Sequence, residues 1–362
     1  MLFLFSSTFL SLLSLLSLFS LFISTSYSTQ YLRGTTYRVN QLMVNKSIVI
    51  FNKINVICIF YTSFRCMMWQ CNLLHSYINC LFALYTLSYI QTHEYTGKKK
   101  LKLDSFILRN IYKLFKLFGE YHIINDYIND DNNINNEEIY MMGIHPHGIF
   151  PIGTIGCLGL PSNIESIDKI IPIINTKNIY IGIASFCFYI PGLREFFLFV
   201  GAVDCSRPIL ERFLKNKKSL AIFMGGAEEA IYSGLGKTDL IIYKRFGFFQ
   251  LAIEHGATII PIYTFGNNNI YESQTNDIFG ILNTIKLISG IRFPLGKPIL
   301  KQQKYITVIG RPIKVQKFKK GEYNNYDINM LQTKYIENLK EIFNKYKNLD
   351  QTCIDKELNI IE

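Results

Sequence analysis

Short apolar runs alternate with amphipathic stretches from residue 139 to residue 315, and this alternation restricts the fold more than any other feature of the chain. Strands are predicted over 139–144, 179–183, 196–203, 220–224, 258–264 and 306–309. Helices are predicted over 208–217, with Pro208 in the first turn, over 246–255, which Gly256 closes, and over 329–347. Strands and helices that alternate in this way form a sheet covered by helices, so the sequence predicts an α/β fold.

Two long stretches near the N-terminus contain no Asp, Glu, Lys or Arg. They cover 2–23 and 67–90, and His75 is the one side chain in them that would be charged near neutral pH. Each stretch is long enough to cross a bilayer as a helix, and the first also suits the apolar core of a signal sequence. The sequence therefore predicts a membrane region with embedded helices over 1–96 and a second domain over 97–362.

Lysines follow the second apolar run directly, at Lys98, Lys99, Lys100 and Lys102. Clustered lysines beside a span stay on the cytosolic side, so the 97–362 domain is expected to face the cytosol. The net charge of +11 suits a protein that lies against anionic membrane lipids. A nucleic-acid partner is not expected, because zinc-finger spacing, RNA-binding signatures and basic stripes interleaved with aromatics are missing from the sequence.

Residues 100–138, at the start of the second domain, contain two different sequence patterns. Basic and apolar residues recur at helical spacing over 100–123, which predicts an amphipathic helix. The Asn- and Asp-rich stretch 125–138 is expected to be an exposed loop.

Two of the six histidines, His145 and His147, stand one residue apart where the strand predicted over 139–144 ends. Catalytic groups in α/β sheets collect at such ends. Zinc would need further ligands, and neither a HExxH pattern nor a nearby Cys/Asp pair supplies them. The other chemistry is general-base catalysis, in which an imidazole takes a proton from a hydroxyl near neutral pH. A pair of hydrogen-bonded core histidines is the alternative without a catalytic role.

A glycine-rich stretch, "FMGGAEEAI", follows another predicted strand. The backbone N–H groups of Gly226 and Ala227 are candidates to face a developing oxyanion, and Glu229 is a candidate to orient a histidine. In the plainer interpretation, Gly225 and Gly226 form a turn and the two glutamates are solvated acids at a helix start.

Arg207 precedes the helix predicted over 208–217. An arginine there is suited to bind a phosphate with two parallel hydrogen bonds. A surface salt bridge is the equally good alternative.

Taken in order, these stretches resemble the diacylglycerol acyltransferase 2 family of the glycerolipid acyltransferases. The family's HPHG block is intact at His145 to Gly148, and its "GGAAEA" block is matched at 225–230 with Glu228 in place of an alanine. Its "RKGF" to "FG" block is matched from Arg245 to Gly266. Further similarity lies at Arg194 to Arg207 and at 307–315, so the resemblance covers residues 80 to 345.

The resemblance implies a glycerolipid-acyltransferase-like sheet and the transfer of a fatty acyl group from acyl-coenzyme A to the hydroxyl of diacylglycerol, at the endoplasmic reticulum membrane. His147 is the predicted base, and His145 is predicted to shape the site or to hold the acceptor. The wider superfamily places an aspartate five positions after its histidine, where this chain has Phe150 or Ile152, so Glu229 is the predicted substitute. The predicted substrate-binding residues are Pro146, Gly148, Arg207, Gly225, Gly226, Ala227, Arg245 and Gly247.

The expected co-substrate is acyl-coenzyme A, with no metal and no further cofactor, and membrane lipids are the expected surroundings. The sequence is compatible with either a monomer or a homo-oligomer. Alternatives are a monoacylglycerol or fatty-alcohol (wax) acyltransferase, or a non-catalytic lipid-binding or lipid-droplet protein. Two departures stand out: Asn267, Asn268 and Asn269 replace the family's usual Glu-Asn-Glu, and Phe246 replaces a usual lysine, which weakens one contact to coenzyme A phosphates.

Overall fold

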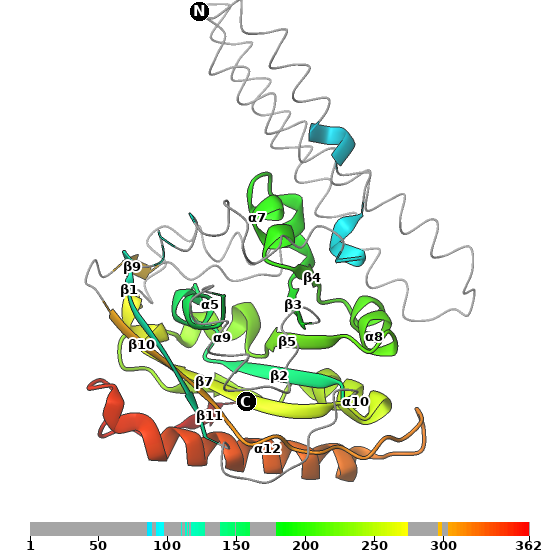
Figure 1. The fold of residues 1–362 in the computed structure, drawn as a ribbon. Helices are drawn as coiled ribbons and strands as arrows, with labels where there is room; N and C mark the ends of the chain where they lie inside the picture. Colours follow the sequence, from blue (N-terminus) through cyan, green and yellow to red (C-terminus); the bar gives the residue numbers. More distant parts are fainter. Residues whose placement is uncertain are drawn as a thin grey trace, which may run out of the picture.

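A seven-stranded sheet forms the centre of the molecule, with the strand order β1-β10-β7-β2-β5-β3-β4 (Figure 1). The structure is a computed structural model and describes residues 85–88, 92–97, 110, 113, 115, 117–126, 138–148, 150–159, 179–273, 296–298 and 303–361. The strands of this sheet are β1 (Gly119–Asn125), β2 (Tyr140–His145), β3 (Ile179–Ile183), β4 (Ala202–Asp204), β5 (Ser219–Phe223), β7 (Thr258–Phe265) and β10 (Gln303–Ile309). The α/β prediction is confirmed.

The strands from β7 to β4 run parallel to one another, whereas β10 pairs antiparallel with β7 and carries β1 parallel to itself at the edge. Two small sheets accompany the large one. They pair β6 (Asp239–Ile241) with β11 (Asn359–Ile361) and β8 (Tyr271–Ser273) with β9 (Gly296–Pro298). Because the central strands are parallel, their carboxyl ends meet at one edge, and the segments that follow them converge there.

Helices cover both faces of the sheet. They are α5 (Ile152–Gly159), α7 (Leu193–Phe199), α8 (Arg207–Lys215), α9 (Gly226–Tyr232), α10 (Phe246–His255) and α12 (Asn325–Tyr346). Short 3-10 turns are η1 (His93–Tyr95), η3 (Ser185–Tyr189), η4 (Asn267–Ile270) and η5 (Lys347–Leu349). Figure 1 shows α12 under the sheet and α5 above it.

Alternation along β2 divides the core between these two layers. All six β2 residues are buried, as suits a strand in the middle of a parallel sheet. Met141 packs in a cluster with residues of α8, α10 and α12, whereas Tyr140, Met142 and Ile144 belong to a separate cluster on the α5 side. By this alternation the next residue, His145, faces the layer that contains α12.

Two local predictions are wrong. The run 196–203 is helix α7 followed by β4, because Gly192 and the side chain of Glu195 form a capping box that starts a helix at Leu193. The helix predicted over 100–123 does not extend to its end, since Gly119 begins strand β1, where Glu120 is exposed and Tyr121 partly buried. Most of 100–116 lies outside the described residues.

The apolar runs 2–23 and 67–90 also lie outside the described residues, apart from 85–88. Among the helices that the structure does describe, we find none with the length and apolar character needed to cross a bilayer.

A buried ion pair ties the segment after the second apolar run to the sheet domain. Arg194 of α7 lies 3.4 Å from Glu94 of η1, and both side chains are completely buried. Arg194 also pairs with Glu195 at 3.0 Å and donates to the carbonyl of Ser88. Three polar contacts from two distant parts of the sequence thus meet at one guanidinium.

Candidate active site

The HPHG loop, His145 to Gly148, leaves the carboxyl end of β2 between β5 and β7. The two neighbouring strands lead into the other predicted blocks, because α9 follows β5 and η4 follows β7. The structure therefore brings the histidines and the glycine-rich block together, and it adds a third segment, at η4, that the sequence had not assigned to the site.

His145 is completely buried and faces α12, as the β2 alternation requires. Its Nε2 lies 2.9 Å from the hydroxyl of Tyr335, a completely buried residue of α12. Gly143 makes room for this contact, since a Cβ there would lie 2.1 Å from the Tyr335 hydroxyl. Burial lowers the pKa of His145 to about 3, so the ring is neutral near pH 7. The predicted partner of a histidine was Glu229, and for His145 that partner is Tyr335 instead.

His147 is partly exposed and is held through a different contact. Its Nδ1 lies 2.7 Å from the carbonyl oxygen of Gly148. A carbonyl only accepts, so Nδ1 carries the hydrogen and Nε2 carries the lone pair. The imidazole ring and the Phe223 ring pack in an edge-to-face arrangement. Burial lowers the pKa of His147, an effect that the Gly148 hydrogen bond opposes and the positive Arg245 reinforces. The imidazole is therefore a neutral base near pH 7.

Glu229 contacts the HPHG loop through the backbone and not through an imidazole. Its Oε1 accepts from the backbone N–H of His147 at 2.6 Å, and its Oε2 accepts from that of Ile241 in β6 at 2.9 Å. The side chain is completely buried, and burial raises the pKa of Glu229 to about 7 against the opposing effect of the two N–H donors. The prediction that this carboxylate orients a histidine ring is corrected: it clamps the loop that carries the ring.

The glycines of the second block leave space for this clamp. A Cβ at Gly225 would lie 2.1 Å from the Glu229 carboxyl group, and Gly226 has a φ of +60°. Arg245 donates to the Gly225 carbonyl at 2.6 Å and to Glu228 at 3.1 Å. A Cβ at Gly247 would meet no atom within 4 Å. Arg245, Gly225 and Gly226 thus lie together next to His147, while the oxyanion role of the Gly226 and Ala227 N–H groups stays a prediction.

Arg207 is bound by protein acceptors. Its guanidinium donates to Glu211 at 2.9 Å, to Gln250 at 3.0 Å and to Glu254 at 2.6 Å. These contacts join α8 to α10, and they are the salt bridge that the sequence left as the alternative to phosphate binding. The three contacts use three of the five N–H groups of Arg207, and the two carboxylates already balance its charge.

Asn267 is a residue of the site that the sequence did not predict. Its Nδ2 donates to the carbonyl of Pro146 at 3.0 Å, and its Oδ1 accepts from the backbone N–H of Gly153 at 3.1 Å. Gly148 has a φ of +65°, and a Cβ there would lie 2.8 Å from the Asn267 Nδ2. The unusual asparagine triplet was the available signal, because a charge-free triplet in place of two glutamates indicates neutral hydrogen bonding.

Comparison with known proteins identifies the family of the chain. A family model described as "Diacylglycerol acyltransferase" matches residues 72–361. The chain belongs to the diacylglycerol acyltransferase family. Diacylglycerol O-acyltransferase 2 of Dictyostelium discoideum is 30% identical over 285 residues, which is 74% of this chain and 81% of that protein.

Two mammalian relatives extend the comparison. Diacylglycerol O-acyltransferase 2 of Homo sapiens is 27% identical over 76% of this chain and 74% of its own length. In Mus musculus, 2-acylglycerol O-acyltransferase 1 is 32% identical over 58% of this chain and 65% of its own length. The acyltransferase family predicted from the four sequence blocks is therefore confirmed, and its relatives are named for two different acceptors.

Within this acyltransferase family member, the described site contains two imidazoles with separate surroundings. One is sealed in the core against Tyr335, and the other is partly open beside Arg245 and the glycine-rich block. Among the predicted site residues, Arg207 lies away from the HPHG loop, in an ion pair between α8 and α10. Glu229 binds the backbone N–H groups of His147 and Ile241.

Proposed function

We propose that the chain transfers a fatty acyl group from acyl-coenzyme A to the free hydroxyl of a diacylglycerol, which forms triacylglycerol and releases coenzyme A. The family membership and the names of the relatives support this reaction. The observation that carries it is the geometry of His147. Its Nδ1–H donates to the Gly148 carbonyl, so Nε2 carries the free lone pair that a general base needs.

The proposed reaction begins when Nε2 of His147 takes the proton of the acceptor hydroxyl. The oxygen attacks the thioester carbonyl, and the backbone N–H groups near Gly226 and Ala227 are the proposed donors to the resulting oxyanion. The tetrahedral intermediate collapses, the C–S bond breaks, and the proton held by His147 passes to the departing thiolate. Because a thiolate leaves readily, the mechanism needs no metal ion to polarise the carbonyl.

The pH dependence of kcat/KM tests the protonation state of His147. Burial lowers the pKa of this imidazole, so the basic form persists below the usual histidine value of about 6.5. We expect activity to fall as the pH decreases through a value below 6.5, measured with initial rates in microsomes between pH 5 and 8. Glu229, whose pKa burial raises to about 7, can also produce an acid limb, so an acid limb above 6.5 that persists in the Glu229→Gln variant would contradict the assignment.

A labelled-product experiment tests the acceptor. Microsomes from a yeast without its own neutral-lipid synthesis, expressing this chain, are given labelled acyl-coenzyme A with diacylglycerol, 2-monoacylglycerol or a fatty alcohol. We expect labelled triacylglycerol with diacylglycerol as the acceptor. The mouse relative makes monoacylglycerol the second candidate. Label that appears only in diacylglycerol or in wax ester would overturn the proposal.

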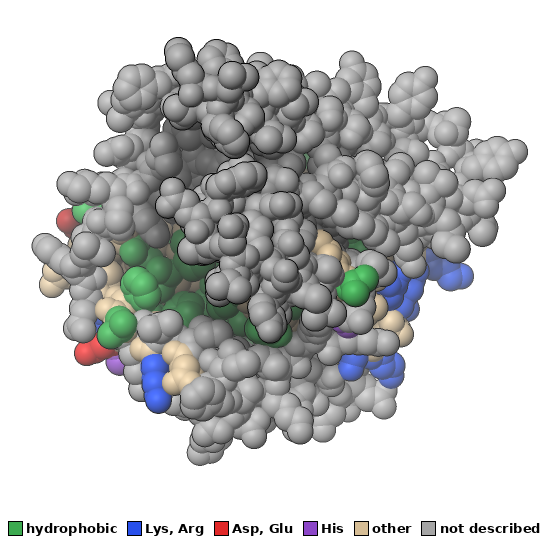
Figure 2. Space-filling model, turned by 90° about the horizontal axis from the view of Figure 1, so that it is seen from above, with side chains coloured by type: hydrophobic (Ala, Val, Ile, Leu, Met, Phe, Trp, Pro, Cys, Tyr) green, Lys and Arg blue, Asp and Glu red, His purple; other side chains and the backbone are tan. Residues whose placement is uncertain are grey.

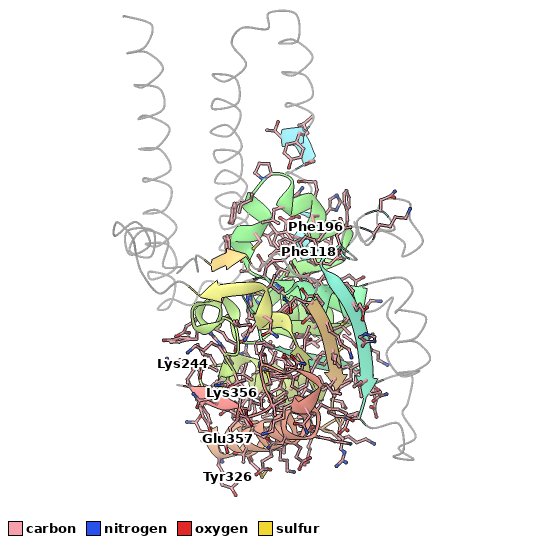
Figure 3. All side chains as sticks on the ribbon, turned by 90° about the vertical axis from the view of Figure 1, so that its left-hand side faces the viewer. Phe118, Phe196, Lys244, Tyr326, Lys356 and Glu357 are labelled. Carbon is pink, nitrogen blue, oxygen red and sulfur yellow. The ribbon has the colours of Figure 1, made fainter. Side chains whose placement is uncertain are left out.

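We also place the protein at the endoplasmic reticulum membrane, with the sheet domain in the cytosol. The lysines after residue 97 support this orientation. Figure 2 shows hydrophobic side chains gathered on the face that lies toward α7, with Lys and Arg at its margin. In Figure 3, Phe196 of α7 and Phe118 lie near each other in the upper part of the sheet domain, and Lys356 and Glu357 lie in its lower part. Protection of the HPHG loop from protease inside sealed microsomes would contradict this topology.

A further inference from the structure

Asp350 lies beyond α12, where the chain turns toward β11, and it reaches back to the segment after β7. Its Oδ2 accepts from the backbone N–H of Gly266 at 2.9 Å. The Asn269 amide donates to both carboxylate oxygens, each at 3.2 Å. Thr352 adds its backbone N–H at 3.0 Å and its hydroxyl at 2.8 Å. The carboxylate thus collects neutral donors from both segments.

These contacts flank Asn267, which lies between Gly266 and Asn269 in the sequence. The Asn267 side chain is 1% exposed, and its amide holds the HPHG loop at the Pro146 carbonyl and, at 3.5 Å, at the His147 carbonyl. On its other side the Asn267 oxygen accepts from Gly153 at the start of α5. A displacement of η4 would therefore displace the backbone of His147.

Each amide in this arrangement has a function that a carboxylate cannot perform. Asn267 donates to a carbonyl, and Asn269 donates to the Asp350 carboxylate. A carboxylate at position 269 would place two negative groups at hydrogen-bond distance and leave Asp350 without that donor. The hydroxyl of Thr352 also lies 3.1 Å from the Asn269 oxygen, so its one hydrogen is shared between this oxygen and the Asp350 carboxylate.

We propose that Asp350 is a positioning residue for the HPHG loop. It fixes Gly266 and Asn269, and it thereby keeps the Asn267 amide against the backbone of His147. The inference rests on the proposed role of His147 as the base. It assigns a function in catalysis to the segment after α12, although this segment lies far from the HPHG loop in the sequence.

The acid limb of the kcat/KM profile separates positioning from a direct charge effect. Arg245, the Glu229 carboxylate and the Phe223 ring face His147. If Asp350 acts only through its charge, loss of that negative charge lowers the pKa of the His147 imidazole. A loosened loop instead exposes His147 to water, which weakens the effect of burial and raises its pKa. The two explanations predict shifts of opposite sign.

The test compares Asp350→Asn, Asn269→Asp and their combination with the wild-type chain in microsomes. Asp355→Asn, at an exposed position in the same segment, is the matched control. We expect Asp350→Asn to lower kcat about tenfold, the effect of one lost orienting hydrogen bond, with the KM for acyl-coenzyme A unchanged. Its acid limb should move upward, toward 6.5. Asn269→Asp should be worse, and the combination, which restores an amide beside a carboxylate, should recover much of the loss.

Three outcomes would overturn the inference. Unchanged kcat and acid limb with a lower melting temperature would make Asp350 a scaffold residue, and a downward acid limb would indicate a charge effect. If activity does not recover when Asp350→Asn and Asn269→Asp are combined, the proposed pairing of Asp350 with Asn269 is wrong. If Asp350→Asn does not accumulate, Thr352→Val removes the hydroxyl that both Asp350 and Asn269 contact and should shift kcat and the acid limb in the same directions. A His147→Ala variant that stays active would instead refute the proposed function, whatever the Asp350 variants do.

Discussion

Replacement of His147 by alanine is expected to lower turnover by about 10²–10⁴-fold, which is the usual contribution of a general base. The variant keeps the backbone N–H that Glu229 binds, so the loop clamp persists and the amount of protein should not change. The measurement is the rate of labelled triacylglycerol formation at saturating acyl-coenzyme A, divided by the amount of immunodetected protein. Loss of the side chain alone then accounts for the loss of rate.

The contrast with His145 is the control for this prediction. We expect His145→Ala to lower turnover about tenfold, because it removes a buried hydrogen bond to Tyr335 and no reacting group. Tyr335→Phe removes only the hydroxyl and keeps the ring packing on Phe248 and Phe249, so it should have a similar or smaller effect. The two histidine substitutions combined should be little worse than His147→Ala. A nearly active His147→Ala beside an inactive His145→Ala would reverse the two roles.

Substitution of Arg194 by methionine is expected to destabilise the protein by about 3–5 kcal/mol, the usual cost of removing one partner from a buried ion pair. The Glu94 carboxylate would stay completely buried without its guanidinium partner. Because Glu94 follows the second apolar run, the loss should loosen the attachment of that segment to α7. Thermal unfolding in detergent, followed by size-exclusion chromatography of the remaining soluble protein, would measure the shift.

Two variants make the Arg194 experiment specific. Arg311→Met changes an exposed arginine in the same way and should leave the melting temperature nearly unchanged. Combining Arg194→Met with Glu94→Gln removes the carboxylate charge with which Arg194 pairs and should recover part of the loss. An Arg194→Met protein as stable as the Arg311→Met protein would show that this ion pair contributes little to the fold.

Strand β3 and helix α10 were the most predictable elements of the fold, since both begin and end where the sequence places them. The error at 196–203 has a physical reason. A run of aromatic and aliphatic residues suits either a strand or a buried helix, and the hydrogen bond between the Gly192 N–H and the Glu195 carboxylate decides for the helix. Strands β6 and β11 were missed because each is three residues long, too short for a period to be visible.

The site was predictable as a set of blocks but not as a set of contacts. Sequence order gave no indication that Tyr335, 190 positions from His145, would be its partner. It likewise could not show that Glu229 binds backbone N–H groups, because that depends on how β6 lies beside the HPHG loop. Residue types at strand ends indicate which groups meet, whereas the packing of helices and short strands decides which atoms touch.

The sealed position of His145 also makes the protein sensitive to acid. In the unfolded chain this imidazole takes up a proton near pH 6.5, whereas in the folded protein it does so only near a pKa of about 3. Protons therefore favour the unfolded state over the whole interval, at a cost of about 1.4 kcal/mol for each pH unit below 6.5. Glu229 offsets this cost between about pH 7 and 4.5, because its raised pKa of about 7 lets the folded protein bind a proton there that the unfolded chain does not. Below pH 4.5 the His145 cost is no longer offset, so elution buffers in that range should inactivate the enzyme by unfolding.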